Sequence, residues 1–372
     1  MVTPNQPSGT PGAAKGRGLP TIIQRVAAFI ADPETENFED LALDVISYQK
    51  EHNPAFGALF SREQSSGLSH WSEVPWVPTE AFRSFKLSTA PEQRVFLTSG
   101  TSGSSSGKHY LPDTGLYDLA WKEPFRRHLL PDRQTMSVLS LIPDETEAPQ
   151  SSLSYMVSRI LNVFGEASSG VFVQQQELQA ERLEKKLRDH IEHNLPALIL
   201  GTAFSMVHFL DYLGERRLQL PVGSRIMDTG GFKGRSRELE RDQLLNLYEQ
   251  TLGIPETHVV GEYGMTELCS QYYEATLVRH QQSKDPKRIY VAPHWVRTQI
   301  LNPETLQPQP KGHRGLVAHF DLANAWTVSS VLTGDLGVLV EDGFLVFGRA
   351  PGTELRGCSL SSEFLELKHD TP

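Results

Sequence analysis

The stretch RVFLTSGTSGSSSGKHY (residues 94–110) joins a short apolar strand to a loop of small and hydroxylic residues that ends at Lys108. Glycines let backbone N–H groups converge on an anion, while hydroxyls and the lysine add donors and charge. It is not a Walker A loop, because Lys108 is followed by His109 and Tyr110. We predict a phosphate loop, then a short connection and a helix over 114–130; a flexible Gly/Ser linker is the alternative. The candidate ligands are Thr98, Ser99, Gly100, Thr101, Ser102, Gly103 and Lys108.

Strands and helices alternate beyond this loop, which is typical of an α/β fold with mostly parallel pairing. Two helices within residues 20–60 are expected to form an N-terminal cap. From about Tyr290 short strands follow one another without helices, which predicts a smaller β-rich subdomain with a hairpin turn at 341–343. Between these parts we expect strands over 136–142, 197–200, 225–228 and 258–261, and helices over 154–164, 175–193, 206–213 and 236–252.

Composition narrows the classes of function. A net charge of −10 without any Lys/Arg block disfavours a nucleic-acid partner. The chain has no run of 18 apolar residues and no secretory signal pattern, so we expect a cytoplasmic protein. Its two cysteines, Cys269 and Cys358, lie far apart, which suits a reducing compartment and excludes a cysteine-based zinc site. His190 and His193 are expected on a solvated helix face rather than at a metal.

A second motif, GEYGMTE (residues 261–267), follows another short apolar strand. In open α/β sheets ligands bind at the carboxyl ends of strands. We therefore expect Tyr263 to stack on a base, Thr266 to meet a phosphate and Glu267 to hold Mg²⁺. The alternative is the start of a helix that has Thr266 as its N-cap.

A third motif, TGDLG (residues 333–337), places Asp335 where a carboxylate can accept two ribose hydroxyls. Alone, it also fits a tight turn closed by an aspartate. The three motifs together favour a nucleotide site.

In their order and separation these segments resemble the adenylate-forming superfamily of acyl-CoA synthetases, luciferases and nonribosomal-peptide adenylation domains, over roughly residues 95–357. The resemblance implies ATP and Mg²⁺ as cofactors. For the phosphates and the metal, it implies that the loop from Thr98 to Lys108 binds the ATP phosphates, that Thr266 contacts the α-phosphate and that Glu267 coordinates Mg²⁺. For the adenine, it implies that Gly230 and Gly231 line the base and that Tyr263 packs on it, with Glu262 and Gly264 alongside. Asp335 and Arg349 would hold the ribose.

The chain also departs from that superfamily. Its full-length members continue past the hinge into a mobile domain that carries a lysine, and this domain is not expected here. The hinge after Gly348 and Arg349 lacks the acidic pair, and Cys358 follows it directly. Lys108 and Lys233 are our candidates for replacing the missing lysine. Phe204, Met206 and Phe209 are candidates for lining an acyl pocket, whereas Cys269 is expected to pack in the core.

Three features together resemble the acyl-protein synthetases of the bacterial luciferase system: the altered hinge followed by Cys358, the short length of the chain, and the motif EYGMTEL at residues 262–268. The resemblance implies a fatty acid substrate, capture of the acyl group on Cys358, and a reductase or carrier protein as acceptor. Two other hypotheses remain: a ligase of phenylacetate-CoA type that delivers to coenzyme A or a carrier, and a non-catalytic nucleotide-binding scaffold.

The implied organisation has five parts. They are a disordered tail (1–19), a helical cap with an extended segment (20–90), an α/β adenylation core (91–289), a β-rich subdomain (290–349), and a truncated hinge with a tail (350–372) that carries Cys358. The sequence leaves open the length of the acid, the identity of the acceptor, whether the pathway makes light, and the oligomeric state.

Overall fold

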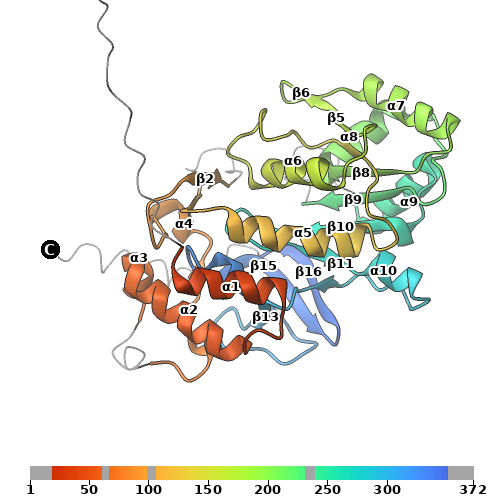
Figure 1. The fold of residues 1–372 in the computed structure, drawn as a ribbon. Coiled ribbons are helices and arrows are strands. Elements are labelled where there is room, and N and C mark those ends of the chain that lie inside the picture. Colours follow the sequence, from red (N-terminus) through yellow and green to blue (C-terminus); the bar gives the residue numbers. More distant parts are fainter. Residues whose placement is uncertain (1–18, 61–66, 99–105, 231–238, 351–372) are drawn as a thin grey trace, which may run out of the picture.

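The computed structural model describes residues 19–60, 67–98, 106–230 and 239–350. In Figure 1 helices α6 to α9 surround strands β8 and β9 at one end of the molecule, and α1 to α4 gather at the other end near β13 and β15. The α-helices are α1 (Thr21–Ala31), α2 (Phe38–His52), α3 (Pro54–Gly57), α4 (Ala81–Ser84), α5 (Gly115–Leu129), α6 (Ser152–Phe164), α7 (Ala180–Glu192), α8 (Ala203–Leu213), α9 (Arg241–Leu252) and α10 (Thr276–Gln281), with 3₁₀ turns η2 (Trp71–Glu73), η3 (Glu256–His258) and η4 (Leu322–Asn324).

One large sheet runs through the described residues in the order β13-β14-β15-β16-β12-β11-β10-β9-β8-β4-β5, and β1 pairs with β15. Two small hairpins, β2–β3 and β6–β7, lie outside it. The strands are β1 (Val77–Pro78), β2 (Arg94–Leu97), β3 (Lys108–Leu111), β4 (Ser137–Ser140), β5 (Gly170–Val171), β6 (Val173–Gln174), β7 (Glu177–Leu178), β8 (Ala197–Thr202), β9 (Arg225–Thr229), β10 (Val259–Tyr263), β11 (Tyr272–Glu274), β12 (Tyr290–Val291), β13 (Val296–Leu301), β14 (Arg314–Asp321), β15 (Ser330–Val340) and β16 (Gly343–Arg349).

The parallel half of the sheet is buried on both faces. Strands β4, β8, β9 and β10 pair in parallel, and successive residues of each strand enter different cores. Leu198 and Leu200 pack in one cluster with α5 and α6, whereas Ile199 packs in another with α7, α8 and α9. Because both faces are covered, β8 reads as a continuous apolar run over residues 197–200, as is usual for parallel sheets.

The N-terminal helices dock on the segment between β14 and β15. Asn37 caps α2 by accepting hydrogen bonds from the backbone N–H groups of Glu39 and Asp40. Further along the same helix, Gln49 is fully buried and donates to the carbonyl of Asn324 at 2.9 Å. The two N-terminal helices expected from the sequence are confirmed as α1 and α2. The contact of Gln49 with Asn324 braces the connection that, as described below, holds the candidate site.

The structure corrects four local predictions. The phosphate loop is followed first by β3, which pairs antiparallel with β2, and only then by α5. No helix begins at Thr266: the chain turns and returns as β11. The helix expected from residue 175 begins at Ala180, because residues 173–178 form a hairpin. The reason is tertiary pairing, which local patterns do not report.

His190 is the fourth correction. It was expected on a solvated helix face, but it is only 2% exposed. One ring nitrogen lies 3.0 Å from the hydroxyl of Ser137 and the other lies 2.9 Å from the carbonyl oxygen of Leu195. Both nitrogens are therefore satisfied by the protein, as a buried polar ring requires. His193 is exposed, as predicted.

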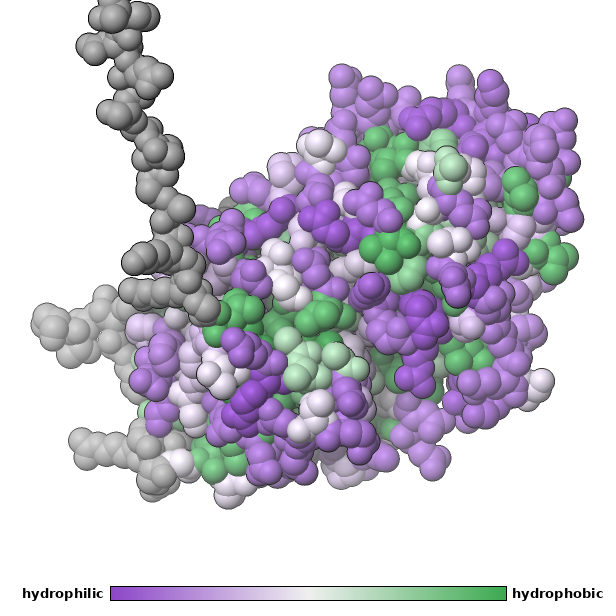
Figure 2. All heavy atoms as spheres, in the orientation of Figure 1, coloured by the Kyte–Doolittle hydropathy of each residue, from purple (hydrophilic) through white to green (hydrophobic). Residues whose placement is uncertain are grey.

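Figure 2 shows polar side chains over most of one face of the molecule, with apolar side chains gathered in small separate patches. Within the described part of the chain, none of the helices combines the length and the apolar character needed to cross a membrane.

Candidate active site

The carboxyl ends of the parallel strands lie side by side. Thr202 of β8 is in register with Thr229 of β9, which is in register with Glu262 of β10. The hydroxyl of Thr229 donates a short hydrogen bond to the Glu262 carboxyl. Directly after β9, Gly230 adopts φ +68°, a conformation that disfavours residues with a side chain. This edge is where open α/β sheets bind ligands.

The turn that follows β10 is held from a distant segment. The side-chain amide of Asn324 donates to the carbonyl of Glu267 at 2.8 Å, and its oxygen accepts from the backbone N–H of Cys269 at 2.7 Å. Asp321 accepts from both the backbone N–H and the hydroxyl of Ser270, at 3.0 and 2.8 Å. Thr266 and Glu267 thus sit on a turn whose backbone is hydrogen-bonded to buried side chains, which limits their movement.

The base of the phosphate loop lies against this turn. Thr98 and Gly107 close the loop with two hydrogen bonds, from Thr98 N–H to the Gly107 carbonyl at 2.9 Å and from Gly107 N–H to the Thr98 hydroxyl at 2.8 Å. The Thr266 hydroxyl lies 3.5 Å from the carbonyl oxygen of Leu97. Lys108 begins β3 and is exposed. Two motifs whose contacting residues are 169 positions apart in the sequence are therefore adjacent in space.

The third motif joins the hinge residue. Asp335 and Arg349 are paired across β15 and β16, with 3.3 Å between the Arg349 Nε and an Asp335 carboxylate oxygen. The other carboxylate oxygen accepts a hydrogen bond from the Tyr263 hydroxyl at 2.8 Å. The Asp335 side chain is 11% exposed and that of Arg349 is 66% exposed, so the arginine faces solvent at the rim. The predicted base-stacking and ribose-binding side chains are thus in direct contact.

Burial controls the charges of this region. It raises the pKa of both Glu262 and Glu267 to about 7, and the hydrogen bond from Thr229 lowers that of Glu262 only in part. The positive charge of Arg349 acts in the opposite direction on Glu267. Burial also lowers the pKa of His109 to about 4, which keeps this imidazole neutral at physiological pH.

The chemistry of Glu267 fits a magnesium ligand. The residue is 9% exposed, and burial disfavours the charged form of its carboxyl group, so a bound cation would stabilise the carboxylate. In the described part of the chain no three His, Cys, Asp or Glu side chains gather into a metal-binding group. Mg²⁺ commonly takes one or two carboxylates and completes its shell with water and substrate phosphates. Glu267 would therefore be the protein ligand of a metal that arrives with the nucleotide.

The family of the chain follows from comparison with known proteins. The family model described as "Acyl-protein synthetase, LuxE" matches residues 69–365. The chain belongs to this acyl-protein synthetase family. The match spans the loop, the turn after β10, the Asp335–Arg349 pair and Cys358.

Individual relatives are distant. The chain is 22% identical over 331 residues to a long-chain-fatty-acid–luciferin-component ligase of Aliivibrio fischeri, with 84% of each sequence covered. It is 23% identical over 322 residues to the protein of the same name from Vibrio harveyi, with 80% of each covered. Among solved structures, an open conformation of 2-hydroxyisobutyryl-CoA ligase superposes with a TM-score of 0.58 at 15% identity, covering 84% of this chain and 69% of that one. That likeness shows the fold.

Three predictions are confirmed by these findings: the acyl-protein synthetase family, the α/β fold of the adenylate-forming enzymes, and a ligase rather than a scaffold. The roles of individual residues remain predictions. The structure brings together Thr98, Gly230, Glu262, Tyr263, Gly264, Thr266, Glu267, Asp335 and Arg349 around one edge of the sheet. Outside the described residues lie Ser99, Gly100, Thr101, Ser102, Gly103, Gly231, Lys233 and Cys358.

Two of the three side chains considered for an acyl pocket belong to the core, whereas Phe204 is only half-buried. Met206 and Phe209 are fully buried on α8 and pack with Ile199 and Ile226 in the cluster that lies under α7 to α9. A side chain at Gly201 would meet the Met206 sulfur at 2.6 Å, so this helix packs closely on β8. Cys269 is 1% exposed and packs in the other cluster, as predicted.

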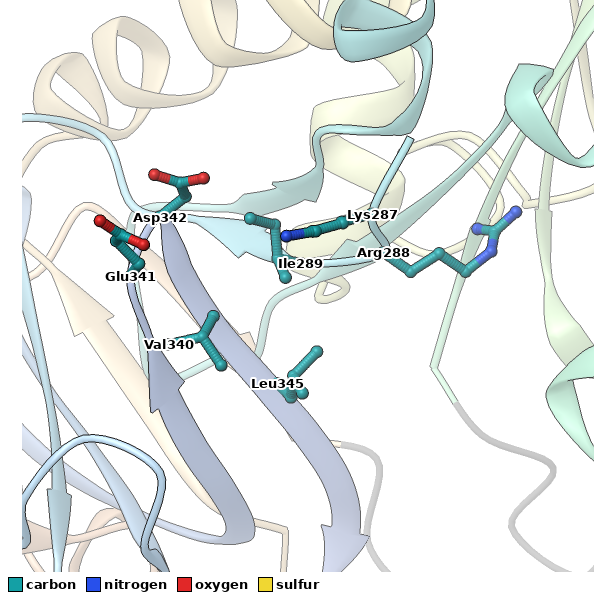
Figure 3. Close-up of a pocket in the computed structure, with 7 residues that line it drawn as sticks. All are labelled: Lys287, Arg288, Ile289, Val340, Glu341, Asp342 and Leu345. Carbon is teal, nitrogen blue, oxygen red and sulfur yellow. The ribbon is translucent and has the colours of Figure 1, made fainter. Parts of the chain in front are cut away.

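A cavity of about 360 Å³ lies away from this site. Figure 3 shows it between residues 287–289 and the β15–β16 turn, with the Arg288 side chain directed away from the carboxylates of Glu341 and Asp342. Arg288 pairs instead with the buried Glu274 at 2.6 Å. Because Asp335 and Arg349 lie at the opposite end of the β15–β16 pairing, this cavity plays no part in our proposal. Its lining residues are Lys287, Arg288, Ile289, Val340, Glu341, Asp342 and Leu345.

Glu262 makes the stability of the protein depend on pH. A carboxyl whose pKa is raised from 4.5 to about 7 by folding stabilises the folded state fully below pH 4.5 and loses that contribution as the pH rises to about 7. We expect Glu262→Gln, which keeps the shape but cannot ionise, to stabilise the nucleotide-free protein at pH 8 by up to about 3 kcal/mol and much less at pH 5. Thermal unfolding at both pH values measures this, with exposed Glu177→Gln as the control. An equal change in stability at the two pH values would contradict the raised pKa of Glu262.

Proposed function

We propose that this chain activates a long-chain fatty acid with ATP, forms an acyl-adenylate, and transfers the acyl group through Cys358 to a partner protein. The observation that carries the proposal is the meeting, at one strand edge, of the loop base, the Thr266–Glu267 turn and the Asp335–Arg349 pair. We infer the long-chain acid from the two relatives, both of which are named long-chain-fatty-acid–luciferin-component ligases. Two well-separated cysteines suit a cytoplasmic setting.

The nucleotide would lie across this edge. Asp335 has one carboxylate oxygen bonded to Tyr263 and the other beside Arg349, and a carboxylate can accept further hydrogen bonds from ribose hydroxyls. The ring of Tyr263 would pack on adenine beside the open turn at Gly230. The phosphates would then extend toward Thr266 and the loop that Thr98 and Gly107 close. We infer this orientation of the nucleotide because Tyr263 contacts Asp335 and Thr266 lies beside the base of the loop.

Adenylate formation needs positioning and charge rather than a general base. The fatty acid is ionised near pH 7, so its carboxylate oxygen attacks the α-phosphorus, a P–O bond forms, and the bond to the pyrophosphate oxygen breaks. Negative charge spreads over phosphate oxygens in the transition state. The Thr266 hydroxyl, loop N–H groups and Lys108 would stabilise it, with Lys233 a second candidate cation. Mg²⁺, held by Glu267, would neutralise phosphate charge when bound.

The second half of the proposed reaction is acyl transfer. The thiolate of Cys358 attacks the carbonyl carbon of the acyl-adenylate, a thioester forms, and AMP leaves with the electron pair of the broken C–O bond. A partner such as an acyl reductase or a carrier protein would then accept the acyl group. The description of the family as acyl-protein synthetases supports acyl transfer to a protein group, and the matched residues include Cys358.

Pyrophosphate exchange tests the adenylation step. The full chain, Mg²⁺-ATP and labelled pyrophosphate are incubated with short, medium and long saturated fatty acids or with phenylacetate. We expect exchange to depend on the acid and to be fastest with the long chains. Exchange with phenylacetate alone, followed by transfer only to coenzyme A, would favour the phenylacetate-type ligase. No exchange with any acid would overturn the proposed function.

A further inference from the structure

His109 occupies the space between the phosphate-loop hairpin and the turn after β10. It is the second residue of β3, next to Lys108, and is 1% exposed. One ring nitrogen, Nδ1, lies 2.6 Å from the carbonyl oxygen of Thr266, and the other, Nε2, lies 3.0 Å from the hydroxyl of Thr327. The edge of Phe82 packs against the imidazole with 5.6 Å between ring centroids. The ring is therefore wedged among three segments.

The partners determine which nitrogen carries the proton. A carbonyl oxygen can only accept, so Nδ1 must donate to Thr266. Burial lowers the pKa of His109 to about 4, so the ring is neutral and Nε2 is left as an acceptor. The Thr327 hydroxyl then donates to Nε2, its nearer partner, rather than to the Asn324 carbonyl at 3.3 Å. The tautomer with its proton on Nδ1 therefore satisfies both ring nitrogens, the Thr266 carbonyl and the Thr327 hydroxyl.

This contact links two parts of the candidate site that are far apart in sequence. On one side, β3 is in register with β2, and Lys108 pairs with Leu97, whose carbonyl approaches the Thr266 hydroxyl. On the other side, the turn is already held at Glu267, Cys269 and Ser270 by side chains of residues 321 and 324. The Thr266 carbonyl is bonded to neither of these, and His109 supplies its partner.

We propose that His109 is a positioning residue for adenylate formation: its Nδ1–H holds the Thr266 carbonyl and so fixes Thr266 and Glu267 relative to the β2–β3 hairpin at the base of the phosphate loop. The proposal rests on the function proposed above, because it assigns His109 to the same site. His109 touches neither the nucleotide nor the acid in this assignment. Its effect passes through the backbone of Thr266.

Two amide variants separate this role from simple packing. In His109→Asn the amide nitrogen can occupy the place of Nδ1 and donate to Thr266. In His109→Gln the amide reaches the place of Nε2, toward Thr327, and the Thr266 carbonyl loses its donor. Both side chains are neutral and polar, but Asn is one methylene shorter and leaves the larger void, so a purely structural role would penalise His109→Asn at least as much as His109→Gln.

The first readout is backbone hydrogen exchange over residues 264–271, which requires no catalysis. The N–H groups of Leu268, Cys269 and Ser270 are hydrogen-bonded in this turn. We expect His109→Gln to accelerate their exchange roughly 10- to 100-fold while His109→Asn stays near wild type, because a loosened turn opens more often. Exchange that is equal in the two variants would overturn the proposal.

The second readout is the kinetics of pyrophosphate exchange. We expect His109→Gln to lower kcat roughly 10- to 100-fold, the range seen when a residue that orients a functional group is removed, with a smaller change in KM for ATP. His109→Asn should recover most of the lost kcat. Equal kcat in both variants would overturn the positioning role. A wild-type chain with no exchange activity would refute the proposed function, and the hydrogen-exchange comparison would still decide the role of His109.

Discussion

Replacing Cys358 by serine is expected to remove the acyl-enzyme while leaving adenylation intact. With Mg²⁺-ATP and a long-chain acid, wild type should gain the mass of one acyl group that neutral hydroxylamine removes, because thioesters are cleaved under these conditions. The variant should show no such adduct, since an unactivated serine hydroxyl is a far weaker nucleophile than a thiolate. Its rate of pyrophosphate exchange should stay close to that of wild type, because Cys358 acts after the adenylate has formed. Intact-mass spectrometry and the exchange assay measure the two steps separately.

The second cysteine is the matched control. Cys269 is 1% exposed, and burial raises the pKa of its thiol well above the usual value. A buried thiol that stays protonated does not attack an adenylate. Cys269→Ala should therefore keep the adduct. Loss of the adduct in Cys269→Ala and its persistence in Cys358→Ser would reverse the assignment.

Glu267→Gln is expected to lower the rate of adenylation on the order of 10²- to 10³-fold, the loss typical when one group that stabilises transition-state charge is removed. The amide keeps the length and shape of the side chain but offers Mg²⁺ a weak neutral oxygen. The proposed magnesium ligand is thereby removed with little change in packing. Pyrophosphate exchange measured across a range of Mg²⁺ concentrations should show both a lower maximum and a higher Mg²⁺ requirement.

Protein stability provides the control for this variant. Burial raises the pKa of Glu267 from 4.5 to about 7, so in the nucleotide-free protein its charge is unfavourable above pH 7. Glu267→Gln should therefore unfold at the same temperature as wild type or higher at pH 8, which would show that lost activity does not come from unfolding. A variant that keeps the wild-type rate and Mg²⁺ dependence would exclude Glu267 as the metal ligand. A variant that unfolds earlier would contradict the buried-charge argument.

The predictions that succeeded rest on local patterns. The apolar run at 197–200 identified β8, because a strand covered on both faces favours apolar residues throughout. The strand expected at 225–228 was also found, as β9, although Arg225 and Asp228 are charged. The motifs were found because their glycine, hydroxyl and carboxylate residues come directly after strands, where open α/β sheets bind ligands. The residues that hold the site were missed. Asn324, Asp321 and His109 carry no local signature, although the polar His109 beside Lys108 at the end of the loop was a visible departure from a glycine-rich pattern.

The secondary-structure errors have the same origin. The alternative interpretation of Thr266 as the N-cap of a helix relied on the capping preference of threonine, yet the N–H groups of Cys269 and Ser270 bond to Asn324 and Asp321 instead. The expected helix over 175–193 included residues 175–178, although these belong to the hairpin formed by residues 173–178. In each case a partner elsewhere in the chain or a tight turn outweighed a weak local preference.

The amino-acid sequence alone determined the class of fold, the order of the three nucleotide motifs and the family, because each is written in short segments whose residue types have a direct physical use. Only the tertiary structure decided how those motifs meet: Tyr263 with Asp335, the loop base with Thr266, and His109 between hairpin and turn. These contacts join residues 72, 169 and 157 positions apart. Such pairings follow from how the whole sheet packs, and no local pattern in the chain encodes them.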